Sequence, residues 1–435
     1  MKNYKIFVAL GLIVLSVLSA YQLFSENLEK INQYNKALEK ARYCCEFELV
    51  DAANYYDEVL SLNKSVDVYE EYVEFYLKQK DYSSAEGVAE RLINDFPKDS
   101  TGYYLMLSIY DKKEDYKEFF SVYNTALNKK IKSEKIDELY KKNEYQYYDA
   151  VKNSKTVKNY MNGFYAVEND DGLWGYTDTS GSVIISCDYL YAGGFSGEMA
   201  SVKDSNGSLY YVNEDNKRKF VLDTNEKYDY LGQVVDGIFA VGINNKYSYY
   251  NMDSKKEFGD FEYAGTFNCG IAAVKDGGKW MIIDKSGKAI SEKYDEILMD
   301  DNDIACINNR VIAVKDKVFY ILNEKGKVVK KTDFEDMAMI SSDNLFAFKK
   351  GGKWGFCDEN GKVKISPEYE AARSFSNEFA AVCKNGKWGY ITSENKVVID
   401  CKFDKCLDFN SKGCAYVCED GESFKMIKLY KTNYD

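Results

Sequence analysis

Histidine is absent from this sequence of 435 residues. Its absence removes the side chain that most often serves as a general base near neutral pH, and the nitrogen that most often binds metals. The sequence also lacks a long basic run. Its 58 Lys and Arg residues are interspersed with 70 Asp and Glu residues, which gives a net charge of -12. Because nucleic acid is held largely through its phosphates, we expect no nucleic-acid partner.

The motifs of common enzymes are missing as well. The chain has no P-loop, no Gly-x-Ser-x-Gly turn, no GxGxxG after a strand and no metalloprotease helix motif. A glycosidase needs only two carboxylates, and Asp300, Asp301 and Asp303 supply three, but no pair stands apart from the repeat pattern described below. We therefore expect no enzyme, no cofactor and no metal site.

A run without charge lies close to the N-terminus. Residues 6–24 read IFVALGLIVLSVLSAYQLF, and a helix of this length spans roughly 28 Å of hydrocarbon, enough to cross a bilayer. Lys2 and Lys5 precede the run and Glu26 follows it, which places the N-terminus in the cytoplasm. We expect residues 1–25 to be a transmembrane anchor or signal-anchor of a single-pass cell-membrane protein with its bulk outside the cytoplasm.

A cleaved signal peptide is the alternative for the same run. Val17 and Ser19 would form a weak small-residue cleavage site. No cysteine lies near the end of the run, so the pattern does not predict lipoprotein attachment. The sequence leaves open whether the segment is cleaved.

Residues 26–150 are predicted to form a TPR-like helical domain. Apolar residues recur at helical spacing, and the stretch matches itself after a shift of 34 residues, the period of tetratricopeptide repeats. The matched pairs include Tyr69 with Tyr103, Tyr76 with Tyr110, Asp81 with Asp115, Tyr82 with Tyr116, Ala85 with Phe119 and Ala89 with Tyr123. Because aromatics replace alanines in the second unit, that helix pair is expected to pack loosely or to cap the array. The domain is either a spacer or a peptide receptor.

From residue 156 to 435 the pattern changes to short alternating strands separated by Gly, Asn and Asp. An apolar slot recurs at Trp174, Leu209, Tyr247, Trp280, Val318, Trp354, Trp388 and Phe424. So even a period predicts a β domain of about eight repeats. Gly-Lys-Trp-Gly-Tyr or -Phe stands at 352–356 and 386–390, with a variant at 172–176. On these motifs the chain resembles the WG-repeat family of bacteria, which implies repeat architecture but no particular activity.

Each repeat is expected to hold three strands, tight turns and a Tyr-Asp or Phe-Asp step. The segments 178–181, 284–287, 323–326 and 358–361 begin with Asp or Asn and end with Gly, which is typical of a type I turn with a G1 bulge. They lack the ordered oxygen ligands of a calcium loop, so we interpret them as hairpins.

The signature residues of the repeat are interpreted as structural. They are Trp174, Gly175, Trp280, Trp354, Gly355, Trp388 and Gly389. A large ring can pack against the neighbouring repeat while the glycine admits another backbone. The alternative is a row of exposed rings that stack on sugars, but Leu209 and Val318 replace Trp in two slots and favour packing.

The ends of the repeat array indicate how it closes. The last unit stops before its third strand, and Tyr148-Asp149 resembles the tail of a unit whose beginning is missing. One blade shared between the two ends of the array would close a propeller and protect its edge strands. We therefore favour a propeller-like ring over an open β-solenoid.

Eleven cysteines remain to be explained. In the repeat register Cys187 and Cys401 match Pro367, Cys406 matches Ala372, Cys414 matches Phe379, and Cys383 matches Cys418. We interpret them as small apolar fillers of repeat positions and not as zinc ligands, because they lack paired Cys-x-x-Cys spacing.

Three functions follow from these patterns. The first is a membrane-anchored, non-catalytic interaction scaffold that presents helical and β repeats to a protein or peptide. The second is a cell-wall or carbohydrate-binding protein that uses exposed aromatics. The third is an enzyme hidden in the ring, which requires a polar pocket with carboxylates of shifted pKa.

Overall fold

The computed structural model describes residues 2–47, 51–158, 160–224 and 226–431, and of these it leaves out the side chains of 2–15, 17 and 151–153. Its contacts divide the chain into a helical unit, Met1–Gln146, and a β unit, Tyr147–Asp435. Each unit is described by itself. The sequence placed the corresponding boundary between residues 150 and 156.

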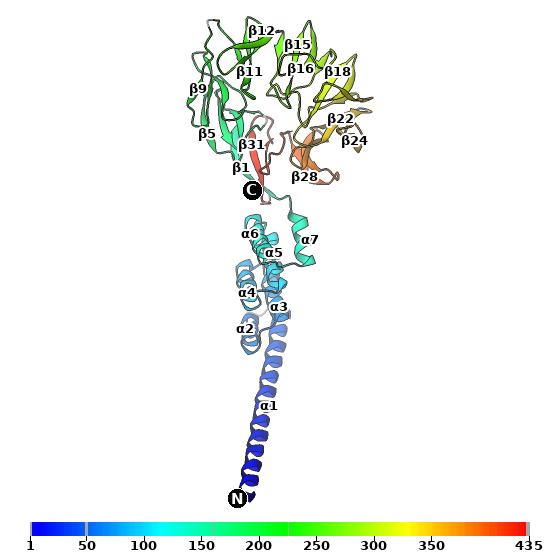
Figure 1. Ribbon diagram of the computed structural model, residues 1–435. Coiled ribbons are helices and arrows are strands. Elements are labelled where there is room, and N and C mark those ends of the chain that lie inside the picture. The colour runs from blue at the N-terminus through cyan, green and yellow to red at the C-terminus, as the bar shows by residue number, and fades with distance from the viewer. Residues whose placement is uncertain (1, 48–50, 159, 225, 432–435) are drawn as a thin grey trace. The chain divides into compact units, whose positions relative to one another are not determined.

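Seven helices lie in the described part of the helical unit (Figure 1). They are α1 (Lys2–Glu46), α2 (Ala52–Leu62), α3 (Val66–Lys78), α4 (Tyr82–Asp95), α5 (Ser100–Lys113), α6 (Tyr116–Asn128) and α7 (Glu134–Asn143). The starts of α3 and α5 are separated by 34 residues (100 − 66), as are those of α4 and α6 (116 − 82). Asp81 and Asp115 cap α4 and α6 by accepting the backbone N–H groups of Ser84 and Glu118.

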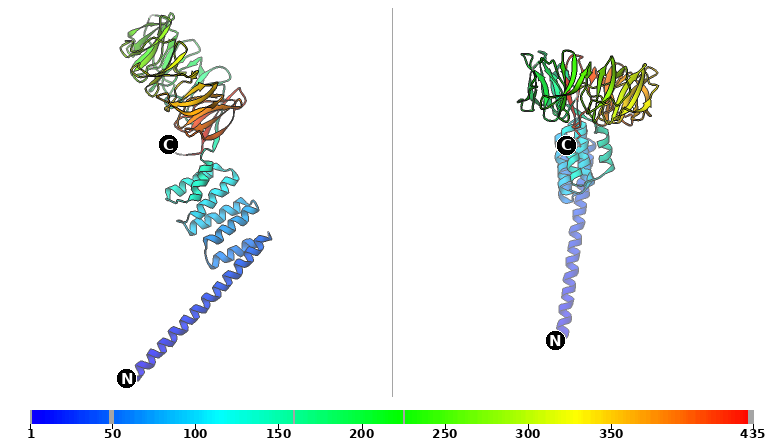
Figure 2. Two further views of the ribbon diagram at one scale, coloured as in Figure 1. Left: turned by 90° about the vertical axis from the view of Figure 1, so that its right-hand side faces the viewer. Right: turned by 45° about the horizontal axis from the view of Figure 1, so that its top comes forward.

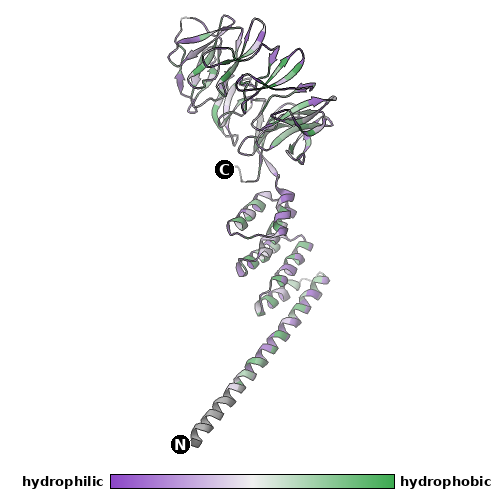
Figure 3. Cartoon of the chain, turned by 45° about the vertical axis from the view of Figure 1, so that its right-hand side comes forward, coloured by the Kyte–Doolittle hydropathy of each residue, from purple (hydrophilic) through white to green (hydrophobic). Residues whose placement is uncertain are grey.

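Amphipathic packing holds these helices together, and hydrophilic and hydrophobic residues are interleaved along them (Figure 3). Ala85 and Ala89 are fully buried on α4 and permit a close approach of the neighbouring helices. In the second pair Phe119 is also fully buried, and Tyr123 stacks on Tyr140 of α7 with ring centroids 4.1 Å apart. The aromatic residue at position 123 is therefore accommodated by contact with α7. The helix pairs and their period are observed, and the likeness to TPRs stays an interpretation.

The predicted membrane anchor lies within α1. Among the described residues, no helix combines the length and the apolar character that crossing a bilayer requires. The anchor at residues 1–25 is therefore not supported there, and the side chains of residues 1–15 and 17 lie outside the described part of the chain. The part of the run that is described, including Leu18, Tyr21 and Phe24, is exposed.

The described β unit forms eight antiparallel sheets arranged around a centre as the blades of a propeller (Figures 1 and 2). From the centre outward, blade 1 holds β2 (Thr156–Val157), β3 (Phe164–Glu168), β4 (Trp174–Asp178) and β5 (Val183–Tyr189); blade 2 holds β6 (Tyr191–Ala192), β7 (Ala200–Lys203), β8 (Leu209–Val212) and β9 (Arg218–Phe220); blade 3 holds β10 (Tyr230–Leu231), β11 (Ile238–Ile243), β12 (Lys246–Asn251) and β13 (Lys256–Phe261); blade 4 holds β14 (Tyr263–Ala264), β15 (Ile271–Asp276) and β16 (Lys279–Asp284).

In the second half of the ring, blade 5 holds β17 (Glu296–Ile297), β18 (Arg310–Lys315), β19 (Val318–Asn323) and β20 (Val328–Lys331); blade 6 holds β21 (Asp336–Met337), β22 (Leu345–Lys350), β23 (Lys353–Asp358) and β24 (Val363–Tyr369); blade 7 holds β25 (Ala371–Ala372), β26 (Phe379–Lys384), β27 (Lys387–Thr392) and β28 (Val397–Phe403); blade 8 holds β29 (Lys405–Cys406), β30 (Cys414–Cys418), β31 (Phe424–Leu429) and β1 (Tyr147–Ser154).

The prediction of three strands per repeat was incomplete. Each blade begins with an additional inner strand of two residues, such as β25, and the Tyr-Asp or Phe-Asp step is the passage from one blade to the next. Two residues are too few to show the alternation by which a strand is recognised in sequence.

Ring closure follows the prediction. β1 pairs with β31, so blade 8 takes its outer strand from the start of the β unit and its other three from the end. Lys425 of β31 forms a salt bridge with Asp149 of β1, with 2.9 Å between Nζ and Oδ2. Because the shared blade pairs the edge that an open array would expose, the propeller is closed and the open solenoid is excluded.

Tyrosines join neighbouring blades. Tyr176, Tyr211, Tyr249 and Tyr390 are buried on the third strands of blades 1, 2, 3 and 7. Their hydroxyl groups donate to carbonyl oxygens that follow the inner strand of the next blade, those of Gly193, Gly232, Gly265 and Leu407, over 2.5 to 2.7 Å. A buried ring with a satisfied hydroxyl group stabilises each seam, and this use accounts for part of the high tyrosine content.

The outer hairpins form as predicted. Asp178 Oδ1 accepts the backbone N–H groups of Ser180 and Ser182, and Gly181 closes the turn with φ +82°. Gly287, Gly326 and Gly361 close the other three turns, with φ of +69° to +81°. The aspartates are thus engaged by their own turns.

Candidate functional site

The signature residues predicted from sequence are distributed around the ring. Trp174 begins β4, and Trp280, Trp354 and Trp388 are the second residues of β16, β23 and β27. All four side chains are half-buried, and they belong to blades 1, 4, 6 and 7. The structure does not gather them into one site.

The glycine after the tryptophan faces a bulge in the outermost strand. A Cβ at Gly175, Gly355 or Gly389 would lie only 2.4 to 2.5 Å from the carbonyl oxygen of Ile185, Ile365 or Ile399. These three blades have outer strands of seven residues with register shifts opposite the glycine. In blade 3, where Ser248 replaces this glycine, Gly259 of the outer strand packs on Ser248 instead. One side of the crossing must be glycine because the two backbones touch.

One loop differs from the other loops at the centre of the ring. Six or seven residues connect the inner strand to the second strand in seven blades, as in residues 373–378, whereas blade 5 uses twelve, residues 298–309. Within this loop the Asp303 carboxylate accepts the hydroxyl groups of Tyr230 and Tyr263 over 2.6 Å. The blade-5 loop therefore reaches the centre of the ring and is held there by blades 3 and 4.

A cavity of about 590 Å³ lies beside the blade-5 loop at one mouth of the ring. The loops of blades 1, 4, 5, 6, 7 and 8 line it. Its walls combine apolar side chains such as Met299, Met339 and Phe409 with hydroxyl and amide groups and with the charged side chains of Asp300, Asp301, Arg373 and Asp408. We call it the hub cavity.

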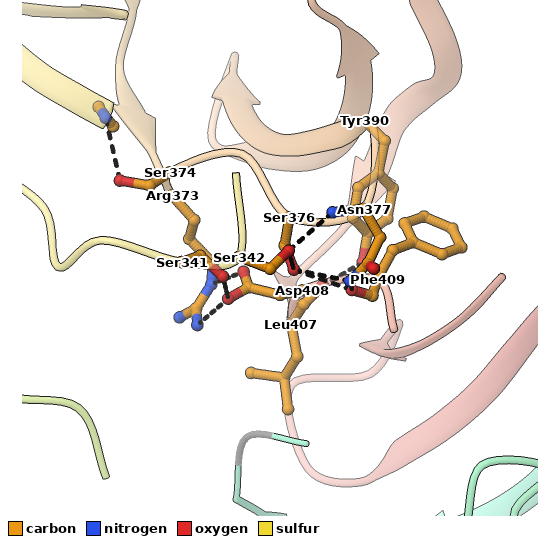
Figure 4. A network of polar contacts seen from close by, with 11 residues as sticks. Ser341, Ser342, Arg373, Ser374, Ser376, Asn377, Tyr390, Leu407, Asp408 and Phe409 are labelled. Carbon is orange, nitrogen blue, oxygen red and sulfur yellow. Dashed lines mark hydrogen bonds and ion pairs between the residues drawn. The ribbon is translucent and has the colours of Figure 1, made fainter. Parts of the chain in front are cut away.

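Arg373 and Asp408 form a two-point ion pair in the wall of the hub cavity (Figure 4). Arg373 donates from Nε to Oδ1 over 2.6 Å and from an Nη to Oδ2 over 3.2 Å. Ser341 also donates to Oδ2, over 3.1 Å. Asp408 raises the pKa of Arg373 above its ordinary value, so the guanidinium stays charged. This pair joins the inner loops of blades 6, 7 and 8.

Hydrogen bonds from turn side chains continue around the same mouth. Asn377 donates from Nδ2 to the carbonyl oxygen of Phe409 in the next blade over 2.7 Å (Figure 4). Asn162 makes the equivalent bond to Phe195 over 3.0 Å. The bond from Asn377, together with the Arg373–Asp408 pair, fixes the lining loops of blades 7 and 8 relative to each other, so this part of the hub cavity is preorganised.

Asp300 is the carboxyl group of the hub cavity with a markedly shifted pKa. Burial raises its pKa to about 6, although Oδ1 accepts the backbone N–H groups of Asn302 and Ile304 over 2.9 Å. Asp301 follows on the surface of the cavity, and neither residue forms a salt bridge within the described part of the chain. The blade-5 loop thus presents negative charge without a bound cation.

Lys158 stands close to the same loop. Its ammonium group donates to the carbonyl oxygen of Ala192 over 2.7 Å and lies over the rings of Tyr191 and Trp174, 4.3 and 5.0 Å from their centroids. Burial lowers the pKa of Lys158, while Asp301 and Asp303 oppose the shift. The aromatic and carbonyl contacts hold this cation against blades 1 and 2, and Asp301 is exposed.

Sequence reasoning missed Arg373 and Asp408, and it noticed Asp300 and Asp301 only as carboxylates. The spacing of the slots did not reveal the long blade-5 loop, because Leu209 and Tyr247 are separated by 38 residues just as Trp280 and Val318 are. The residues of the hub cavity come from six blades, and no local pattern marks such residues as neighbours. Within the described residues no cluster of three or more metal-binding side chains is present.

Comparison with known proteins agrees with the repeat architecture. The family model described as WG containing repeat matches residues 174–207, 259–280, 280–310, 321–354, 354–388 and 388–422. No curated protein matches the chain. The gaps between matches fall near Leu209, Tyr247 and Val318, where the Trp-Gly pair is replaced.

The solved structures that align with this chain share little sequence identity with it. BamB from Moraxella catarrhalis aligns with a TM-score of 0.44 at 8% identity, over 65% of this chain and 100% of BamB. The computationally designed Ika8 protein aligns with 0.42 at 10%, over 65% and 98%. Saccharomyces cerevisiae Sqt1 aligns with 0.39 at 10%, over 65% and 98%. The comparisons establish that the C-terminal region carries WG containing repeats.

Proposed function

We propose that the chain is a non-catalytic interaction scaffold whose propeller binds a polypeptide segment at the hub cavity. The observation that carries the proposal is the convergence of loops from six blades on a partly preorganised cavity of about 590 Å³. Recognition sites for polypeptides combine apolar anchors with a few placed polar groups. The methionines, Phe409 and the carboxylates of the blade-5 loop supply both kinds of contact.

The charge of the hub cavity supports a segment with a basic side chain. Arg373 and Asp408 bind each other, so they contribute little net charge. Asp300 and Asp301 remain as negative groups beside apolar walls, an arrangement that suits the aliphatic stem and charged end of Lys or Arg.

Selection of peptides from a random display library against the full chain tests this proposal. We expect basic peptides that lose at least tenfold in affinity when Asp301→Arg reverses the local charge or Ala338→Trp fills the cavity. Asp171→Trp is the matched control, because Asp171 lies in the turn between β3 and β4, at the end of the blade opposite the hub cavity. If the selected peptides bind all variants equally, the hub cavity is not the site.

Two other functions receive different support. Asp300 meets part of the requirement for an enzyme, since a carboxyl group with a pKa of about 6 lies in a polar cavity. Hydrolysis of chromogenic glycosides that disappears in Asp300→Asn would favour that function. The carbohydrate-binding alternative needs a row of exposed rings, whereas the four tryptophans are half-buried and dispersed.

Attachment to a membrane through residues 6–24, with the repeats outside the cytoplasm, stays a prediction. A cysteine introduced at Ser25, in a chain without its native cysteines, tests it in intact cells with a membrane-impermeant thiol reagent. Labelling before lysis supports external repeats. Labelling only after lysis excludes them.

A further inference from the structure

We propose that Cys269 and Cys306 form a redox-active thiol pair, which a small disulfide oxidises to an intramolecular disulfide joining blade 4 to the blade-5 loop. The proposal concerns a covalent modification site and does not depend on what the hub cavity binds.

Both cysteines depart from the repeat pattern. The second strand of a blade is entered through a two-residue turn whose first residue has positive φ, and that residue is Asn162, Gly197, Asp236, Cys269, Asn308 or Asn377 in blades 1 to 5 and 7. Cys269 adopts φ +52° where the other blades have Asn, Asp or Gly, which tolerate this conformation better. An unfavourable residue at a strained position is a reason to look for a function.

Cys306 departs from the repeat pattern because it replaces a large core side chain. It occupies the core position that holds Phe195, Phe267 and Phe375 in three other blades, two residues before the turn. Cys306 is 1% exposed and packs in the same apolar cluster as Cys269. Thus the two exceptions to the repeat, in neighbouring blades, contact each other.

The contact between the two cysteines stands where other blades have a hydrogen bond from the turn asparagine to the next blade. Where Asn162 and Asn377 donate to a carbonyl oxygen of the next blade, Cys269 Sγ lies 3.6 Å from the carbonyl oxygen of Cys306. Asn268 donates to the same oxygen over 2.8 Å and holds the two segments together.

The environment prepares Cys269 to react first. The neighbouring thiol of Cys306 lowers the pKa of Cys269 below its ordinary value. Burial opposes this shift, the backbone of Asn309 adds to it and the carboxylate of Glu324 opposes it. The same contact and burial raise the pKa of Cys306. Cys269 is half-exposed and therefore reachable, whereas Cys306 is enclosed. A half-exposed thiolate beside a buried thiol is the arrangement of an attacking and a resolving cysteine.

The oxidation balances in two steps. The Cys269 thiolate attacks one sulfur of a low-molecular-weight disulfide such as oxidised glutathione, which forms a mixed disulfide and releases one thiolate. Cys306 loses its proton and attacks Cys269 Sγ, which forms the intramolecular disulfide and releases the second thiolate. The protein loses two electrons and two protons, and the oxidant becomes two thiols.

The disulfide would change the wall of the hub cavity. Asn268 precedes Cys269, Ile307 follows Cys306, and both line the cavity. The bond would also join residues that lie far apart in the chain, so it should raise the unfolding temperature of the propeller.

Peptide mapping of the full chain after exposure to oxidised glutathione tests the proposal. We expect a peptide pair joined through Cys269 and Cys306, and its loss after reduction. Cys306→Ser should instead accumulate glutathione on Cys269. Cys269→Asn introduces the residue that blades 1 and 7 have at the equivalent position, Asn162 and Asn377. This variant should fold and form neither product. Absence of the joined pair in the unmodified protein would overturn the proposal.

Labelling with iodoacetamide adds an independent measurement. Cys187 and Cys401 are half-exposed like Cys269, but burial raises the pKa of each. At pH 7 we expect Cys269 to react roughly fivefold faster than either, because its larger thiolate fraction outweighs its lower intrinsic nucleophilicity. Cys306→Ser should shift the labelling of Cys269 to higher pH. Equal rates at the three cysteines of the unmodified chain would contradict an activated Cys269.

Discussion

The hydroxyl groups of Thr177 and Tyr416 lie 3.2 Å apart and join the first blade of the propeller to the last. The two residues are separated by 239 positions in the chain. Tyr416 also meets Tyr165 of blade 1 edge to face, with ring centroids 4.9 Å apart. Tyr416 lies on β30, the second strand of blade 8, so the closing seam is joined by side chains of a different strand from the seams described above.

Substitution of Tyr416 measures how much this seam contributes to stability. We expect Tyr416→Phe to lower the free energy of unfolding of the propeller by about 1 kcal/mol and Tyr416→Ala by about 3–4 kcal/mol. Tyr390→Ala, at the seam between blades 7 and 8, should have a similar effect. All four tryptophans lie in the β unit, so their fluorescence in urea reports on it selectively. A much smaller effect at Tyr416 would mean that the ring opens at this seam.

A methyl group at the glycine of a Trp-Gly pair should be costly. Because a Cβ at Gly389 would lie 2.4 Å from the carbonyl oxygen of Ile399, Gly389→Ala should destabilise the propeller by about 2–3 kcal/mol. A Cβ at Gly87 in α4 would meet no atom within 4 Å, so Gly87→Ala should stabilise the helical unit by about 0.5–1 kcal/mol. Circular dichroism and tryptophan fluorescence during thermal unfolding separate the two effects.

Arg373→Lys tests the two-point geometry of the pair with Asp408. Lysine keeps the charge but cannot make both bonds, so we expect a loss of about 1–2 kcal/mol in the stability of the propeller. Arg91→Lys is the control, since Arg91 makes an exposed one-point bond to Asp57 and should change stability by less than about 0.5 kcal/mol. Equal effects in urea unfolding would show that charge alone matters at Arg373.

Asp300 should make the stability of the propeller depend on pH. Its folded pKa of about 6 exceeds the ordinary value of 3.8, so protonated Asp300 stabilises the fold fully below about pH 4, and this contribution is lost as the pH rises through 6. Asn at this position stays neutral and retains the acceptor for the two backbone N–H groups. We expect Asp300→Asn to match the unmodified protein near pH 4 and to exceed it by up to about 3 kcal/mol at pH 8.

Urea titrations at a series of pH values measure this difference, and the other ionisable groups cancel because both proteins contain them. A difference that does not vary with pH would mean that the carboxyl group is well solvated.

Much of the β unit could be predicted from local patterns. The tryptophan slots all fall at the start of a third strand, and the Asp-to-Gly segments form the hairpins expected of them. The tail at Tyr148-Asp149 identified the shared blade because pairing an edge strand is favourable in any ring. The inner strands escaped detection, since a pair of residues carries no period.

The hub cavity could not be predicted in the same way. Asp300, Arg373 and Asp408 belong to blades 5, 7 and 8, and their proximity depends on how the ring curves. The sequence patterns did not single out Cys269 or Cys306, because the turn conformation of one and the core position of the other are known only from the structure.

Sequence alone thus determined the repeating unit and its turns, because these depend on contacts within about 40 residues. It also indicated the closure, because the periodicity left an incomplete unit at each end of the array. Tertiary structure alone decided which side chains meet at the centre of the ring. There each blade contributes a loop of a few residues, and the distance between loops is set by the packing of whole blades and not by any sequence interval.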